Sequence, residues 1–453
     1  PERFLAPMAY YHFLRGYLEE LAEDFPKALE QYRAGLQFDS DSTFLRFRMA
    51  SLYFISGNFQ KTVDLLEQID LALVRSPQVL TQMAKMFAGA GKSDRSLHLF
   101  DQALARNQER SESYLEKGIF LFNEKQLDEA GQMFARSVEL APQAPMGYFY
   151  LGKVNQAKNK NEEAQSNYRE TIIRAPQFVR GHQQLYKLLE ADGQVAEAVK
   201  VLEGYLTEVN PHHKRFRQEL VRLLLRHKEF DRALTELEFM MGQDPEDLNA
   251  QIRHALVFAE TKDTSRAIKE MSQIMDRNPS KVQVRDYLGL LYEQADQFEE
   301  AIQTYQFNIE LDPTFYDSQI HLGYLFYRLK RYEEAVPHLR RSLELNPRGP
   351  ESHLLLGLTY TQSQQHKMAV ETFEQGLDRH PKNVDLRFNL GTVYDKLGRF
   401  PDVVREMEAV LELNPDHADA LNYLGYSYAD RGMNINEALA LTQRAVALKP
   451  DNG

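Results

Sequence analysis

The chain has 453 residues, of which 43% are hydrophobic and 26% charged, a composition that supports a large buried core and well-solvated surfaces. Its formal net charge of −12 disfavours general nucleic-acid binding, which depends on positive charge facing phosphates. Cysteine is absent, which excludes a disulfide framework, a thiolate nucleophile and a cysteine zinc site. No run of 18 apolar residues appears, so no segment is expected to span a membrane.

A repeat of 34 residues organises the chain. The string YLGLLYEQADQFEEAIQTYQFNIELDP, around Gly289, matches HLGYLFYRLKRYEEAVPHLRRSLELNP, around Gly323, residue for residue. Self-similarity at such a period marks a repeat architecture. Within one period, two stripes of apolar residues at helical spacing flank a turn at Asp296–Gln297, and Pro313 ends the second stripe. Each period therefore predicts two amphipathic helices, which small residues such as Gly289 and Ala301 allow to approach closely.

In chain order, we count thirteen repeats. The first three, in residues 1–108, are looser and do not close with proline, whereas the ten repeats of residues 109–453 are regular. Single-residue insertions are expected near Glu208–Asn210 and Met433–Asn436, where the spacing of prolines is 35. No linker interrupts the series, so residues 1–453 are predicted to form one continuous solenoid. The closing prolines are Pro142, Pro176, Pro211, Pro245, Pro279, Pro313, Pro347, Pro381, Pro415 and Pro450.

Small residues at the eighth and twentieth positions of the period, and proline at the thirty-second, resemble the tetratricopeptide repeat (TPR). The resemblance implies an all-α fold, a right-handed superhelical α-solenoid of about thirteen helix-turn-helix repeats. The tryptophan often found at the fourth position of the family is missing here. Other residues occupy that position, including Tyr114, Tyr148, His182, Arg217 and Arg387.

Candidates for catalysis have simpler structural explanations. Gly89–Ser93 reads GAGKS, but Met86 stands where a phosphate-binding loop requires glycine, so a turn is predicted. The thirteen histidines show no metal-ligand spacing. Carboxylate pairs such as Glu299–Glu300 and Glu333–Glu334 recur at one place in the repeat, where the second helix begins, a position that favours negative charge. We therefore expect no enzymatic activity, cofactor or metal site.

The resemblance also implies that the first helices line a concave groove and that the second, fifth, sixth, ninth, twelfth and thirteenth positions face a ligand. Carried over to the fifth to seventh repeats, this predicts a basic zone that would hold the carboxylates or phosphates of an acidic partner. The alternative is a solvated helix face paired with Glu190 and Glu219. The zone consists of Lys153, Arg180, Lys187, Arg215, Arg222 and Arg226.

The eighth to thirteenth repeats predict an aromatic zone, which would hold apolar side chains of a partner. The alternative is that several of its members pack against neighbouring helices, Phe388 and Tyr423 above all. The zone consists of Tyr287, Tyr324, Tyr327, Phe388, Tyr423 and Tyr426, beside Glu293, Asp395 and Asp430.

These features favour a non-enzymatic scaffold whose groove binds an extended or helical segment of a partner protein, possibly an acidic one. Alternatives are the recruiting region of a larger enzyme, part of a cell-envelope secretion or export assembly, and self-association. The final stretch, ALNYLGYSYADRGMNINEALALTQRAVALKPDNG, resembles TPR proteins of the bacterial cell envelope. It implies a periplasmic location with a lipid anchor upstream of Pro1; a cytoplasmic location is the alternative.

Overall fold

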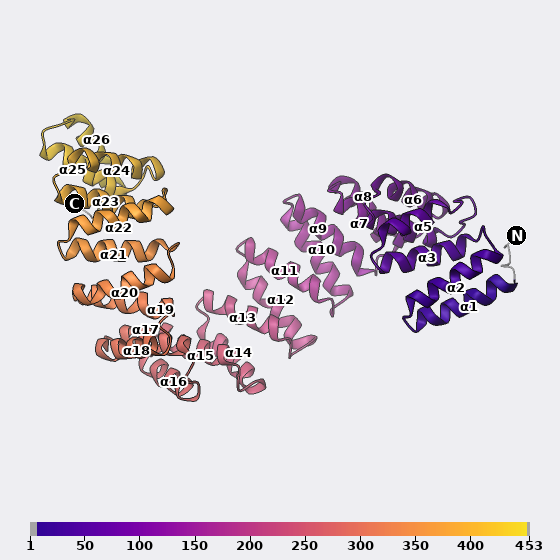
Figure 1. Ribbon diagram of the computed structural model, residues 1–453, viewed down its shortest axis with the longest axis horizontal. Coiled ribbons are helices and arrows are strands. Elements are labelled where there is room, and N and C mark those ends of the chain that lie inside the picture. The colour runs from indigo at the N-terminus through magenta and orange to yellow at the C-terminus, as the bar shows by residue number, and fades with distance from the viewer. Residues whose placement is uncertain (1–6, 451–453) are drawn as a thin grey trace. The chain divides into compact units, whose positions relative to one another are not determined.

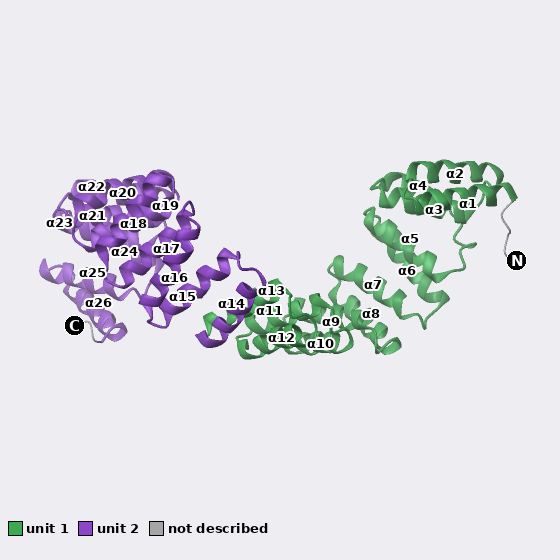
Figure 2. Ribbon diagram, turned by 90° about the horizontal axis from the view of Figure 1, so that it is seen from below, with its two compact units in different colours: residues 1–227 green, residues 228–453 purple. Residues whose placement is uncertain are grey.

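The computed structural model describes residues 7–450, which form 26 α-helices and, within that range, no strand. The helices fall into two compact units, residues 1–227 and 228–453 (Figure 2). Unit 1 contains α1 (Pro7–Leu21), α2 (Phe25–Phe38), α3 (Thr43–Ile55), α4 (Phe59–Glu67), α5 (Pro77–Gly89), α6 (Ser93–Arg106), α7 (Ser111–Asn123), α8 (Leu127–Leu140), α9 (Pro145–Ala157), α10 (Asn161–Arg174), α11 (Val179–Ala191), α12 (Val195–Glu208) and α13 (Lys214–Arg226). Unit 2 contains α14 (Phe230–Gln243), α15 (Leu248–Glu260), α16 (Thr264–Arg277), α17 (Val282–Gln294), α18 (Phe298–Leu311), α19 (Tyr316–Arg328), α20 (Tyr332–Leu345), α21 (Pro350–Gln362), α22 (His366–Arg379), α23 (Val384–Lys396), α24 (Phe400–Leu413), α25 (Ala418–Asp430) and α26 (Ile435–Leu448).

The helices follow the predicted repeats (Figure 1). Within each unit, an odd-numbered first helix packs against the even-numbered second helix that follows it, and that second helix packs against the next first helix. Neighbouring first helices also touch, as α5 touches α7 and α17 touches α19. The all-α fold of thirteen helix-turn-helix repeats is thus confirmed for residues 7–450. The seventh repeat, α13 and α14, falls on the boundary between the units, and the single solenoid across residues 1–453 stays a prediction.

A left-handed residue ends each first helix. Asp296, with a φ of 57°, follows α17, and the N–H of Gln297 donates to the carbonyl of Tyr292 at 2.8 Å. This is a Schellman-type cap, which satisfies carbonyls that the helix end leaves free. Gly91 plays the same part after α5 with a φ of 72°. The segment Gly89–Ser93 is therefore a turn between two helices, as predicted, and not a phosphate-binding loop.

A large side chain of the second helix lies directly on the small residue of the first. A Cβ atom on Gly289 would lie 2.4 Å from the ring of Tyr305, and one on Gly357 would lie 2.4 Å from the ring of Phe373. Both rings are fully buried. The predicted steric reason for glycine at this position is thereby confirmed. The hydroxyl of Tyr305 also donates to Glu293 at 2.8 Å, so the same ring fixes a polar contact across the pair.

Polar residues take the place of the missing tryptophan at the fourth position. Arg217 donates to the carbonyl of Pro211 at 2.6 Å, and Arg387 donates to the carbonyl of Pro381 at 2.8 Å. Each arginine thus satisfies a carbonyl of the loop that leads into its own helix. This contact accounts for a stable loop without the ring that the family often uses there.

The looser repeats have a visible consequence. Helix α4 has nine residues, whereas α2 and α6 have fourteen, and residues 68–76 form an irregular loop. A cavity of about 90 Å³ lies beside the end of α4 and is lined in part by Leu66, Phe87 and Leu99. The two insertions lie between helices, in residues 209–213 and 431–434, where they lengthen a loop without interrupting a helix.

The ring-on-glycine contact predicts the effect of adding one methyl group. Gly289→Ala should lower the free energy of unfolding by about 1–3 kcal/mol, because Tyr305 must leave its place. Gly204→Ala is the control, because no atom lies within 4 Å of its added Cβ atom. That change should stabilise α12 by up to about 1 kcal/mol. Urea unfolding followed by circular dichroism measures both, and equal effects would contradict the packing account.

Candidate functional site

Helices α11 and α13 carry the basic zone because each buries one apolar face. In α13, Phe216, Leu220 and Leu224 recur every four residues and are buried, which turns Arg215 outward. On α11, Leu185 and Leu189 are buried in the same way. Arg180 and Lys187 then project into solvent.

Three of these cations are free. Arg180, Lys187 and Arg215 are exposed, and none makes an ion pair or hydrogen bond with any residue that the structure describes. We call these three residues the basic face. Exposed guanidinium and ammonium groups without an internal partner keep their full capacity to bind an anion.

Two further members of the predicted zone, Arg222 and Arg226, are already paired with a carboxylate of the protein. Arg222 makes a bidentate ion pair with Glu190, with both N–O distances 2.7 Å, and Arg226 donates to the same carboxylate at 2.7 Å. The Nε atom of Arg222 also donates to Glu219 at 2.8 Å. The bond from Arg222 lowers the pKa of Glu190, while that carboxylate raises the pKa of Arg222. This balanced network joins α11 to α13, and it matches the pairing with Glu190 and Glu219 considered as the alternative.

Lys153 is the sixth predicted member, and it lies over aromatic rings. Its Nζ atom is 4.7 Å from the centroid of Phe122 and 5.4 Å from that of Tyr150. Cation–π contacts of this kind hold the half-buried ammonium against its own repeat and the one before. Lys153 is therefore less available to a partner than the basic face.

The aromatic zone of unit 2 also divides into exposed and packed side chains. Tyr287, Tyr324 and Tyr426 are exposed on α17, α19 and α25. Tyr327 is half-buried, with its ring 6.0 Å from that of Tyr332. The three exposed rings are the ones that a partner could contact.

Phe388 and Tyr423 pack against each other, with ring centroids 6.1 Å apart. Tyr423 also donates to Asp395 at 3.0 Å, and Arg431 binds the other oxygen of that carboxylate at 3.1 Å. These contacts favour the packing alternative for Phe388 and Tyr423, and they use the charge of Asp395 inside the protein.

The repeats bring together a serine, a histidine and an aspartate that the sequence analysis did not connect. Asp286 on α17 accepts from the hydroxyl of Ser318 at 2.7 Å and contacts Nδ1 of His321 at 3.1 Å, both on α19. A nucleophile would need to bond to the histidine and to be accessible. Ser318 is fully buried and bonds to the carboxylate. The arrangement is a structural tie between neighbouring repeats.

A second buried carboxylate, Glu293, lies seven residues after Asp286, about two turns further along the same face of α17. Glu293 accepts from Tyr305 at 2.8 Å and from Arg328 at 3.3 Å. Burial raises its pKa above the usual range, although both partners oppose the shift. Glu293 was predicted beside the aromatic zone, but it is buried and bonded within the repeats.

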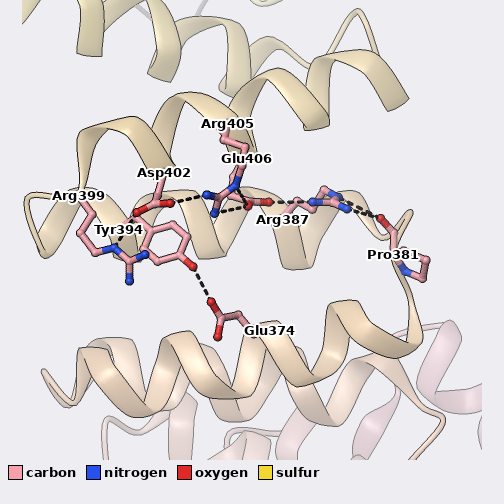
Figure 3. Close-up of polar contacts among 8 residues, drawn as sticks. All are labelled: Glu374, Pro381, Arg387, Tyr394, Arg399, Asp402, Arg405 and Glu406. Carbon is pink, nitrogen blue, oxygen red and sulfur yellow. Dashed lines mark hydrogen bonds and ion pairs between the residues drawn. The ribbon is translucent and has the colours of Figure 1, made fainter.

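A polar cluster at α22, α23 and α24 also consists of charged groups that bond to one another within and between repeats (Figure 3). Its members are Glu374, Arg387, Tyr394, Arg399, Asp402, Arg405 and Glu406. Tyr394 donates to Glu374 at 2.7 Å across two repeats, and Arg387 donates to Glu406 at 2.9 Å within one repeat. Each charged group is bonded to another member of the cluster, so it offers no open acid or base.

Two structural findings bear on the remaining kinds of site. Among residues 7–450, no three histidine, aspartate or glutamate side chains gather closely enough to hold a metal ion. None of the helices in that same range combines the length and apolar character needed to cross a membrane.

The Asp286–His321 contact predicts how stability depends on pH. Burial by itself lowers the pKa of His321, but the bond to Asp286 and the charges of Asp286, Asp317 and Glu293 raise it above its usual 6.5. The folded state therefore favours the imidazolium, so His321 stabilises unit 2 below pH 6.5, and this stabilisation is lost as the pH rises through the raised pKa.

The test is His321→Asn, which keeps a donor towards Asp286 but does not titrate. The wild type should exceed the variant in free energy of unfolding by more at pH 6 than at pH 8.5, as measured by urea unfolding at each pH. A difference that stays constant between these two values would show that His321 does not change its charge.

Comparisons with known proteins add three findings. Profiles described as tetratricopeptide repeat match residues 81–145 and residues 189–257 and 360–425, and one described as TPR repeat matches residues 323–364. No curated protein matches the sequence significantly. Solved structures with a similar fold include those reported below, all of low sequence identity.

The structure titled MamA is 20% identical, covers 36% of this chain and 95% of its own, and gives a TM-score of 0.34. YrrB, titled a TPR protein with an unusual peptide-binding site, is 21% identical, covers 40% of this chain and 93% of its own, and gives 0.35. Yeast Tom70 is 13% identical, covers 89% of this chain and 96% of its own, and gives 0.41.

The profile matches fall in both units. They include α7–α8 and α21–α22, pairs in which Gly118 lies under the ring of Phe134 and Gly357 under that of Phe373. The resemblance to cell-envelope proteins stays a prediction, because no comparison addresses it. On the profile matches and the recurring helix pair, the chain belongs to the tetratricopeptide repeat family.

Proposed function

We propose that the chain is a non-enzymatic interaction scaffold that binds an acidic peptide segment of a partner protein through the basic face. Membership of a repeat family that typically serves as an interaction module supports the scaffold role. The observation that carries the finer proposal is that three exposed cations on α11 and α13 have no hydrogen-bond or ion-pair partner among residues 7–450, in a chain with a net charge of −12.

The charges around the basic face favour an anionic ligand. Glu190 and Glu219, the carboxylates that could neutralise the face, are engaged by Arg222 and Arg226. Arg180 and Lys187 are seven residues apart on one face of α11, which sets a spacing of about two helical turns. A peptide with carboxylates at a similar spacing could pair with both, and Arg215 could bind a further carboxylate through a bidentate contact.

The exposed rings of unit 2 supply a second surface for the same function. Tyr287, Tyr324 and Tyr426 present large, rigid contact areas at low entropic cost. Unlike the basic face, these rings carry no charge and select for apolar side chains. We therefore assign recognition of acidic groups to unit 1 and contact with apolar groups to unit 2.

The charge of the basic face predicts a specific loss of binding. The triple variant Arg180→Glu, Lys187→Glu and Arg215→Glu should bind a labelled acidic peptide at least roughly 100-fold more weakly, since it loses three favourable charge contacts of about 1 kcal/mol each. Fluorescence anisotropy with a peptide of alternating Glu and Leu measures the change, and the Lys-Leu counterpart tests the sign.

Lys92, Lys125 and Lys160 give a matched control, because all three are exposed cations of unit 1 that lie in turns. Changing them to Glu alters the net charge by the same amount and should leave affinity within about threefold, since long-range charge alone is strongly screened. Equal losses of peptide affinity in the two triple variants would show that binding depends on the overall charge of the chain and not on the basic face. No loss in either would refute the proposal.

A further inference from the structure

The cavity beside the end of α4 is not used by the proposed function. It has a volume of about 90 Å³ and lies among α4, α5 and α6, which all belong to unit 1 (Figure 2). Its walls are apolar, since Leu66 on α4, Phe87 on α5 and Leu99 on α6 are 2%, 4% and 2% exposed. Because an apolar cavity gains little from holding water, an apolar group is its favoured occupant.

The irregular loop of residues 68–76 supplies the remaining wall through Ile69 and Leu71. Hydrogen bonds hold this loop in place. The N–H of Ile69 donates to the carbonyl of Leu66 at 3.2 Å. Arg106 of α6 donates to the carbonyl of Leu71 at 2.9 Å. The side chain of Ile69 is also buried. The cavity is therefore built by bonded and packed residues of the fold itself.

Two exposed charges of opposite sign lie at the opening of the cavity. Glu67, the last residue of α4, and Arg95, in the first turn of α6, both line it. Neither makes a hydrogen bond or ion pair with any residue in 7–450, and they do not pair with each other. His98, which also lines the cavity, already bonds to Gln102 at 3.0 Å. The opening therefore offers one carboxylate and one guanidinium to a ligand.

We propose that this cavity binds a free amino acid with a branched aliphatic side chain, such as leucine. The apolar side chain would enter the cavity, while the ammonium group pairs with Glu67 and the carboxylate with Arg95. At about 30 Å³ for each carbon group, which is the volume that a water molecule takes in the liquid, the cavity accommodates roughly three or four carbons. The side chains of valine, leucine and isoleucine have this size.

The two charges at the opening select a free amino acid over the end of a peptide. A residue at the amino end of a peptide has no free carboxylate beside its side chain, and a residue at the carboxyl end has no free ammonium group. Either one would leave Glu67 or Arg95 without a partner, whereas the free amino acid pairs with both. The site shares no residue with the basic face, so it is independent of acidic-peptide binding and the two proposals can fail separately.

Equilibrium dialysis of the full chain with radiolabelled L-leucine tests the proposal, with other compounds added as competitors. Leucine should bind with a dissociation constant of about 1 mM or below. Glycine should bind roughly 100-fold more weakly, because it lacks the four carbons that the cavity would bury. L-leucinamide, which lacks the carboxylate, and N-acetyl-L-leucine, which lacks the ammonium group, should each bind about tenfold more weakly.

Three results of this experiment would overturn the proposal. The first is no measurable binding of leucine at about 10 mM. The second is competition by glycine that equals competition by unlabelled leucine, because the apolar cavity would then play no part. The third is equal affinity for leucine and either blocked derivative, because one of the two charges at the opening would then be unused.

Two single variants test the charges separately, at exposed residues whose replacement should leave the fold intact. Arg95→Gln should weaken leucine binding about tenfold but change the affinity for L-leucinamide less than about twofold, because that compound has no carboxylate for Arg95. Glu67→Gln should weaken leucine binding to a similar degree and spare N-acetyl-L-leucine in the same way. Arg75→Gln is the control, because Arg75 is an exposed cation of the neighbouring loop that does not line the cavity. Equal losses in Arg75→Gln and Arg95→Gln, or no loss in Arg95→Gln and Glu67→Gln, would overturn the proposal.

Filling the cavity gives a further measurement. Leu71→Phe enlarges a half-buried side chain of the loop that lines the cavity. This variant should lose leucine binding while its circular dichroism spectrum stays that of the wild type. Leucine binding that persists in the folded variant would show that leucine binds elsewhere, and it would overturn the proposal.

Discussion

The close approach of two helices over a residue without a large side chain is the constraint on which this protein depends. Where Tyr305 lies over Gly289, or Phe373 over Gly357, no room remains for even one further carbon atom. The second helices bury their large residues in these contacts and against the next first helix. The exposed face of each first helix does not take part in these contacts, so it can carry residues that bind a partner, such as Arg180 on α11 or Tyr324 on α19.

The same stacking decides which charges remain available. Residues 32 to 36 apart in sequence become neighbours, as Glu190 with Arg222 and Arg226, or Asp286 with Ser318 and His321, show. Pairs of this kind join consecutive repeats, and where they are buried, removing one partner would leave a charge without compensation. Cations that lack such a neighbour keep their charge for a ligand. The distinction between structural and available cations therefore follows from the repeat period.

Much of the fold could be predicted because the period is visible in the sequence itself. Gly289 indicates where the two helices of a repeat approach each other closely, and Pro313 indicates where the second helix ends. No residue of comparable meaning marked the early end of α4, because that end depends on how the irregular loop of residues 68–76 packs between two repeats. The basic zone was predicted as six residues, but three of them are held by Glu190 or by aromatic rings. A search for opposite charges 32 to 36 residues apart would have identified two of these three.

The most direct test of the account is to locate a bound acidic peptide on the surface. A Glu-Leu peptide with a central photoreactive residue would be irradiated in complex with the chain, and its crosslinks would be mapped by mass spectrometry. The account predicts crosslinks within residues 179–191 and 214–226, on α11 and α13, and few on the second helices α10 and α12. Crosslinks concentrated on α10 or α12, or in unit 2, would contradict the claim that the exposed faces of α11 and α13 form the binding surface.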